Sequence, residues 1–151
     1  MSEQSYTMTF EAGQTPDEVF AAINNVRGWW SGEIEGETGR PGAEFTYRVP
    51  GIHYCKMRIT EFVPGRKIVW RVLDSDISYT EAKNEWNDTS ITFDISPKDG
   101  MTEIRFTHVG LVPSDECYGN CSNGWNLLVG GNLRKLIATG FDQPSPFAKL
   151  A

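Results

Sequence analysis

The sequence has few basic residues, and they are scattered along the chain. Lys and Arg number 14 against 20 Asp and Glu, which gives a formal net charge of −6. A nucleic-acid binder presents a positive surface to the phosphates, and an anionic membrane attracts the same kind of surface. Because no run of Lys or Arg supplies such a surface, we expect neither a nucleic acid nor a membrane as a partner.

Long apolar runs are missing as well. No stretch approaches the ~20 apolar residues of a transmembrane helix. Residues 1–6 lack the basic flank and apolar run of a signal peptide. The three cysteines are an odd number and too few for a disulfide framework. These absences predict a cytoplasmic protein with reduced thiols.

Cys117 and Cys121 lie four residues apart, and their spacing leaves three interpretations open. A zinc site would need two further ligands, for which Cys55, His53 and His108 are the candidates. A disulfide is possible only if the segment between the two cysteines is not a regular helix. The simplest interpretation is a pair of packed thiols, so we predict three free cysteines, no metal and no cofactor.

Common catalytic motifs are also absent. The sequence has no Gly-rich phosphate loop, no serine elbow and no His–Glu metal motif. The strand positions expected to face the interior carry almost no carboxylate, and Glu61 is the main candidate for one. Chemistry that needs a pair of carboxylates is therefore not supported. Only His108, helped by Tyr47, has the chemistry to move a proton near neutral pH.

What the chain does have is material for one packed domain. Its 151 residues are 39% hydrophobic and 12% aromatic, with five Trp, five Tyr and eight Phe. No repeat or linker divides it. We predict a single domain over residues 1–151, with a core at about 5–140 and a C-terminal tail at 141–151. Pro144 and Pro146 keep that tail from continuing a helix.

A strand over residues 6–10 precedes the first predicted helix. Thr15 is a typical N-cap, Pro16 suits the first helical position, and Glu18 completes a capping box. These signals predict a helix over Pro16–Asn25.

From Ala43 onward the hydrophobic period is two, which predicts antiparallel strands with one buried face. Short turns separate five such runs. Their inward positions are Phe45, Tyr47 and Val49; Cys55, Met57 and Ile59; Ile68, Trp70 and Val72; Ile91, Phe93 and Ile95; and Ile104, Phe106 and His108.

An amphipathic helix is predicted from about Ser122 to Thr139, with Gly140 as its terminating residue. It is the one later segment that can cover the apolar face of the sheet. The predicted fold is therefore α+β: a curved antiparallel sheet wrapped around a long C-terminal helix, with a shorter helix after the first strand.

This order of elements resembles the helix-grip (START-like, SRPBCC) superfamily. Four strings sharpen the likeness: Trp29-Trp30, the segment 57–70, the segment 106–111 and Gly124-Trp125. They resemble a bacterial branch named after the C-terminal domain of the heat-shock chaperone ATPase activator. The resemblance covers about residues 5–140. It implies a single START-like domain with a cavity between sheet and last helix, used for hydrophobic ligands and sometimes for cyclase-type chemistry.

Strand and helix parity select the candidate ligand-binding residues. Tyr47, Trp70 and His108 share the inward face of their strands. Trp125, Val129 and Asn132 form one stripe on the last helix, and Trp29-Trp30 lies between glycines. A few polar groups in an apolar space are typical of a ligand pocket. The candidates are Trp29, Trp30, Tyr47, Trp70, His108, Trp125, Val129 and Asn132.

Several of these residues have two interpretations. His108 is either a core histidine bonded to a backbone carbonyl or a catalytic acid or base. Asn132 needs a buried partner, for which a ligand or a water is a candidate. Trp29 and Trp30 are either a hydrophobic plug or, for one of them, a movable flap.

Three functions follow as hypotheses. The first is binding of a small, mostly hydrophobic molecule. The second is a cyclase, dehydratase or hydrolase that uses His108 as acid or base. The third is a co-chaperone-like interaction module. The tail and the exposed aromatics also suggest a homodimer.

Overall fold

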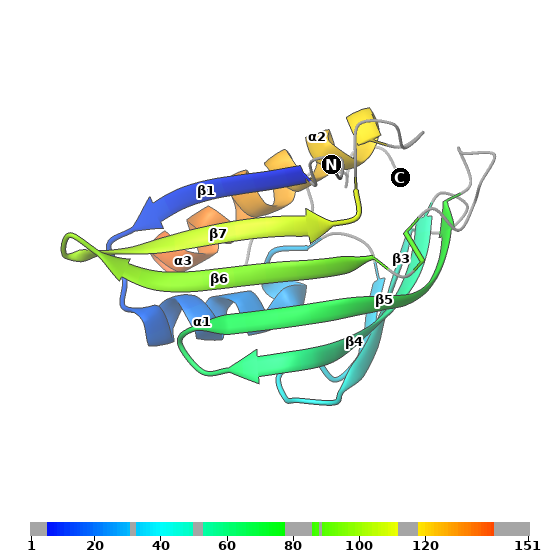
Figure 1. The fold of residues 1–151 in the computed structure, drawn as a ribbon, viewed down its shortest axis with the longest axis horizontal. Coiled ribbons are helices and arrows are strands. Elements are labelled where there is room, and N and C mark those ends of the chain that lie inside the picture. The colour runs from blue at the N-terminus through cyan, green and yellow to red at the C-terminus, as the bar shows by residue number, and fades with distance from the viewer. Residues whose placement is uncertain are drawn as a thin grey trace.

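The computed structural model describes residues 6–30, 33–49, 53–77, 86–87, 89–111 and 118–140. Figure 1 shows the chain as one curved sheet with its helices on one side. The elements are β1 (Tyr6–Ala12), α1 (Pro16–Asn24), the 3-10 turn η1 (Val26–Gly28), β2 (Glu33–Gly36), β3 (Glu44–Val49), β4 (His53–Val63), β5 (Lys67–Ile77), β6 (Ser90–Lys98), β7 (Met101–Val109), α2 (Tyr118–Leu127), the π-helical segment η2 (Leu128–Leu133) and α3 (Arg134–Thr139).

The sheet has seven strands in the order β1-β7-β6-β5-β4-β3-β2. Every neighbouring pair is antiparallel. The register between β4 and β5 shifts twice, between Lys56 and Met57 and between Ile59 and Glu61. Such bulges bend a strand and increase its twist, which helps this sheet to curve.

The inward face of the sheet is the one that the alternation predicted. The inward residues of β4 to β7 are all buried, as are Phe45 and Tyr47 on β3. Burying a large apolar side chain stabilises a fold by about 1.5–3 kcal/mol, so a one-residue slip of register would be costly. The short edge strand β2 was not predicted, because its Ile34 is only half-buried and its other residues are exposed.

The first helix begins as its capping signals predict. Thr15 Oγ1 accepts a hydrogen bond from the Glu18 backbone N–H at 3.2 Å, and the Thr15 N–H donates to Glu18 Oε1 at 2.9 Å. The hydrogen bond from the Thr15 backbone N–H to the carboxylate lowers the pKa of Glu18, and the Thr15 side chain acts in the same direction. The apolar face of α1 is buried through Val19, Phe20 and Ile23.

The C-terminal helix begins at Tyr118, four residues before the predicted start, because Gly119 and Asn120 are weak helix formers that hide its first turn. It does not stay α-helical throughout. Residues Leu128–Leu133 form a π-helical segment that contains Gly130 and Gly131. Gly140, at a φ of 75°, ends the helix as predicted.

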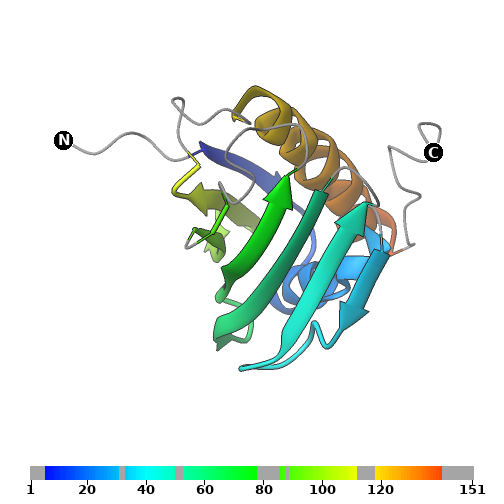
Figure 2. The same ribbon diagram turned by 90° about the vertical axis from the view of Figure 1, so that its right-hand side faces the viewer.

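Both α1 and the C-terminal helix lie on the same side of the sheet (Figures 1 and 2). The predicted apolar positions of the C-terminal helix are all buried: Trp125, Leu128, Val129, Leu133, Leu136 and Ile137. A curved antiparallel sheet therefore grips the last helix, and the predicted α+β fold is confirmed. Within the described ranges, no helix is long and apolar enough to cross a membrane.

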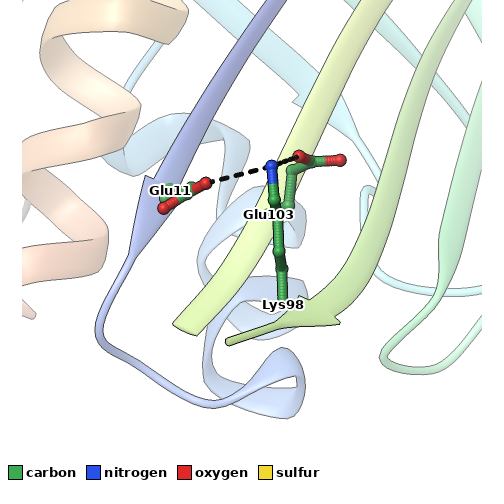
Figure 3. A network of polar contacts seen from close by, with 3 residues as sticks. All are labelled: Glu11, Lys98 and Glu103. Carbon is green, nitrogen blue, oxygen red and sulfur yellow. Dashed lines mark hydrogen bonds and ion pairs between the residues drawn. The ribbon is translucent and has the colours of Figure 1, made fainter. Parts of the chain in front are cut away.

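The end of the sheet formed by the β6–β7 turn is held by exposed polar contacts (Figure 3). Lys98 Nζ lies 3.5 Å from Glu11 Oε2 and 3.2 Å from Glu103 Oε2, which joins β1, β6 and β7. Nearby, the buried Thr102 donates a hydrogen bond from its hydroxyl to Gln14 O at 2.7 Å. We call this region the hairpin end.

Candidate functional site

At the other end of the sheet, beneath α2, five aromatic side chains touch in a closed sequence that we call the aromatic circuit. Its members are Tyr47, Trp30, Trp125, Trp86 and His53. The successive ring centroids are 4.5, 5.3, 5.7, 4.6 and 5.4 Å apart, and the last distance returns to Tyr47. Separations in this range are those of favourable aromatic pairs.

Segments far apart in the sequence bring the circuit together. Tyr47 lies on β3, and His53 is the first residue of the paired strand β4. Trp30 follows the turn η1, whose backbone bonds fold the chain back into the core. Trp86 precedes β6, and Trp125 comes from α2. The circuit therefore joins the concave face of the sheet to the helix that covers it.

His108 lies beside the circuit and is fully buried. Trp125 donates a hydrogen bond from Nε1 to His108 Nδ1 at 3.1 Å. On the other side, His108 Nε2 lies 2.8 Å from Thr89 Oγ1. The single hydroxyl hydrogen of Thr89 goes to Trp86 O at 2.6 Å, so Thr89 accepts from His108 Nε2–H. These contacts fix a neutral imidazole protonated on Nε2.

The surroundings of His108 oppose its protonation. Burial lowers its pKa from 6.5 to about 3, and repulsion from His53 acts in the same direction. A proton on Nδ1 would also face the indole N–H of Trp125. The burial that strand parity predicted for His108 is confirmed, although its partners are side chains and not a backbone carbonyl. Both ring nitrogens are engaged, so this geometry does not favour an acid or base role.

His53 and Trp86 belong to the circuit but were not predicted as site residues. The ring of Trp86 is 4.6 Å from each of the imidazoles of His53 and His108. His53 has the same strand parity as Cys55, so the alternation on β4 could have identified it. Trp86 stands in a polar stretch with no periodicity, and only its size marked it as a core residue.

Three buried nitrogens in or beside the circuit have no hydrogen-bond partner among the residues that the structure describes: Trp70 Nε1, Trp86 Nε1 and His53 Nε2. The Trp70 ring stacks on that of Trp30 at 5.7 Å. Burial without charge compensation lowers the pKa of His53 from 6.5 to about 4, so its imidazole is neutral too. An unpaired buried polar group costs about 1–3 kcal/mol, and native proteins contain few of them.

The remaining candidates lie inside the domain. Trp29 and Trp30 are both buried, and Trp29 Nε1 donates to Ile23 O at 3.1 Å. Both rings occupy the interior position expected of a plug. Asn132 is half-buried and donates from Nδ2 to Trp29 O at 3.2 Å. The sequence suggested a ligand or a water as the hydrogen-bond partner of Asn132, and the structure gives it a backbone carbonyl as a partner. Val129 is buried in the π-helical segment.

The sequence predicted that these side chains line a cavity, and the structure brings them into contact with one another. A separate open hollow of about 390 Å³ lies at the hairpin end, lined by residues 13–16 and 97–102. It shares no residue with the predicted site.

Cys55 and Cys121 are buried thiols that form no disulfide. Burial raises the pKa of Cys55, and the nearby Cys121 adds to the shift. Cys117 lies outside the described residues. Among the residues that are described, no three His, Cys, Asp or Glu gather as a metal site would require.

A curved antiparallel sheet around a C-terminal helix, with an aromatic interior between them, defines a helix-grip domain of the START-like class. The family described as activator of Hsp90 ATPase homolog 1-like protein (AHSA1) matches residues 14–138, and the chain belongs to this family. No curated protein matches the sequence.

Solved structures share the fold at low sequence identity. The Aha1 dimer from Colwellia psychrerythraea is 18% identical, with a TM-score of 0.72 over 91% of this chain and 98% of that one. Protein MLL2253 from Mesorhizobium loti is 14% identical, with a TM-score of 0.70 over 89% and 96% of the two chains. CalU16 from Micromonospora echinospora is 18% identical, with a TM-score of 0.64 over 91% and 78%. At these identities the likeness concerns the fold.

Proposed function

We propose that this domain binds a small, mostly hydrophobic molecule between the sheet and the C-terminal helix, among the side chains of the aromatic circuit. One observation carries the proposal. Trp70, Trp86 and His53 each place an unpaired nitrogen in an otherwise apolar interior. Convergent polar groups in an apolar setting are the usual composition of a small-molecule site.

Binding is favoured over catalysis by the state of His108. A general acid or base needs a nitrogen that can exchange a proton with the substrate. Trp125 and Thr89 occupy both nitrogens of this imidazole. We therefore assign His108 a positioning role, in which it holds Trp125 against the circuit.

Native mass spectrometry of protein purified without detergent tests the binding proposal. We expect a bound species that dissociates on denaturation. Val129→Trp places a large ring on the buried face of the C-terminal helix and should abolish that species. Leu127→Trp, two residues away but half-exposed, is the matched control and should retain it. A wild-type protein that never carries or acquires a small molecule would contradict the proposal.

The oligomeric state is a separate proposal. The relative from Colwellia psychrerythraea is described as a dimer. We propose that this chain also forms a homodimer, as its tail and aromatic content suggested. The tail, residues 141–151, lies outside the described residues. Sedimentation equilibrium of the full chain and of a chain ending at Gly140 should give a dimer for the first, and two monomeric masses would contradict the proposal.

A further inference from the structure

We propose that the ligand of the aromatic circuit is a planar molecule without a negative charge, with an oxygen acceptor that the Trp86 indole N–H binds and with His53 as the second polar contact. This inference rests on the proposed function and makes it specific. It follows from three properties of the site, which concern its donors, its charge and its ring geometry.

The unpaired groups determine the hydrogen-bonding character of the ligand. An indole nitrogen donates and cannot accept. Trp86 is only 3% exposed, and its Nε1–H has no acceptor within the described structure. The neighbouring His53 Nε2 is unpaired too, on a ring 4.6 Å away. A carbonyl or ether oxygen satisfies Trp86, and a neutral imidazole can pair with a second oxygen function.

The interior offers no counter-charge for an anionic ligand. The buried polar residues in the described part of the chain are five threonine or serine residues and His108. The neighbouring imidazoles of His53 and His108 are neutral. Transfer of an anion into such a space without a counter-charge is strongly unfavourable. The site therefore selects against carboxylates and phosphates.

The ring geometry favours a flat ligand. Trp30 is nearly parallel to Tyr47, at 20°, and to Trp70, at 7°. Trp86 and Trp125 form a second nearly parallel pair, at 15°. Parallel faces pack a planar ring system with offset stacking, which such side chains already adopt among themselves. A bent aliphatic chain would leave these faces poorly covered.

Three matched tricyclic probes separate these properties: fluorenone, fluorene and fluorene-2-carboxylate. They share a flat skeleton and differ in a carbonyl acceptor and in a charge. Calorimetric titration should rank fluorenone about two- to tenfold tighter than fluorene, as expected for one net hydrogen bond. The carboxylate should bind more weakly than either. Equal affinities for fluorenone and fluorene would show that no protein donor binds the carbonyl oxygen. Tight binding of the carboxylate would show that the site accepts an anion. Either result would overturn the proposal.

Trp86→Phe keeps a ring and removes the donor. The ratio of the two affinities, fluorenone over fluorene, should fall to about one in this variant, since lost packing affects both probes alike. Phe20→Leu perturbs a buried ring of α1 outside the circuit and should leave the ratio unchanged. If the ratio were unchanged in Trp86→Phe, a donor other than Trp86 would bind the carbonyl oxygen, and the proposal would be wrong. Failure of all three probes to bind the parent protein would overturn the proposed function itself.

The indole N–H resonances of the unmodified protein give a second readout. Fluorenone should shift the Trp86 Nε1–H signal downfield, and fluorene should not. The signals of Trp29 and Trp125, whose N–H groups already have partners, serve as internal references. A Trp86 signal that responds equally to both probes shows a donor already paired, for instance with a buried water, and contradicts the proposal.

Discussion

The two ends of the sheet differ in whether their polar groups have partners. At the hairpin end, Lys98 lies between two carboxylates and the buried hydroxyl of Thr102 has a carbonyl partner. At the circuit end, aromatic rings fill the interior and three nitrogens stay unpaired. A fold selected for stability alone would pair those nitrogens or replace them with carbon. We interpret the circuit end as a region that gives up stability for binding.

The energies make the contrast sharper. An exposed ion pair such as Lys98–Glu11 adds little to stability, because water and salt screen its charges. Each unpaired buried nitrogen costs about 1–3 kcal/mol, which the stacking of the surrounding rings must offset. The comparison therefore predicts that changes at the circuit end have large and unusual effects, whereas changes at the hairpin end have small and ordinary ones.

The largest effect is expected from Trp125→Ala. The change removes a buried ring that touches Trp30, Trp86 and Phe106, and leaves His108 Nδ1 without its donor. Loss of a buried Trp typically costs about 3–5 kcal/mol. Urea unfolding followed by circular dichroism measures the change. A loss below about 1 kcal/mol would mean that the circuit is not packed as described.

Acid should destabilise the domain through its two histidines, the buried His108 and the half-buried His53. In the unfolded chain both take up a proton below pH 6.5, whereas the folded pKa values are about 4 for His53 and about 3 for His108. The unfolded state therefore binds more protons, and stability falls as the pH decreases from 6.5 towards 4. The slope approaches about 1.4 kcal/mol per pH unit for each histidine.

Unfolding free energies measured between pH 7 and pH 4.5 test this dependence. The pKa of Glu18 is lowered from 4.5, so this carboxyl adds its own acid sensitivity only below that window. His53→Phe removes one of the two groups and should roughly halve the slope. An unchanged slope in this variant would contradict the assignment of a neutral, half-buried His53.

Two buried threonines offer a matched pair for the next prediction. Thr89→Val deprives His108 Nε2–H of its acceptor and Trp86 O of its donor, at a cost of about 1–3 kcal/mol. Thr102→Val at the hairpin end loses one bond to Gln14 O and should cost about 1 kcal/mol. Only Thr89→Val should also move the indole N–H resonance of Trp125. If both variants left that resonance unchanged, the coupling through His108 would be wrong.

The smallest effect is expected at Lys98. Lys98→Met breaks exposed contacts with Glu11 and Glu103 and should change the unfolding free energy less than any other variant above, because water already screens these charges. Urea unfolding at low and high salt measures the change, and the difference between variant and parent should shrink as salt screens the charges. A loss as large as that expected for Thr89→Val would contradict the contrast between the two ends of the sheet.

Much of the fold could be predicted from the sequence because burial follows periodicity. Strand alternation placed Trp70 and His108 on the buried face, and the capping box fixed the start of α1. The π-helical segment could not be predicted, because its apolar residues also fit an α-helical stripe. The edge strand β2 lacked a buried face to reveal it.

The candidate site was less predictable, for physical reasons. Parity states which face a side chain occupies, but hydrogen-bond partners depend on contacts between distant segments. For Asn132 the sequence suggested a ligand or a water as partner, and it could not reveal the hydrogen bond to Trp29 O that the fold supplies. Trp86 lies in a stretch without hydrophobic periodicity. Only the tertiary structure shows that its ring contacts both His53 and His108.

Trp86→Phe tests the central claim most directly, through two numbers measured on one variant. If the Trp86 N–H is unpaired in the free protein, its removal should leave the unfolding free energy within about 1 kcal/mol of the parent, since relief of the unpaired donor offsets lost packing. The affinity for fluorenone should fall about two- to tenfold in the same variant. A variant that is clearly less stable yet binds fluorenone as tightly as the parent would contradict the account.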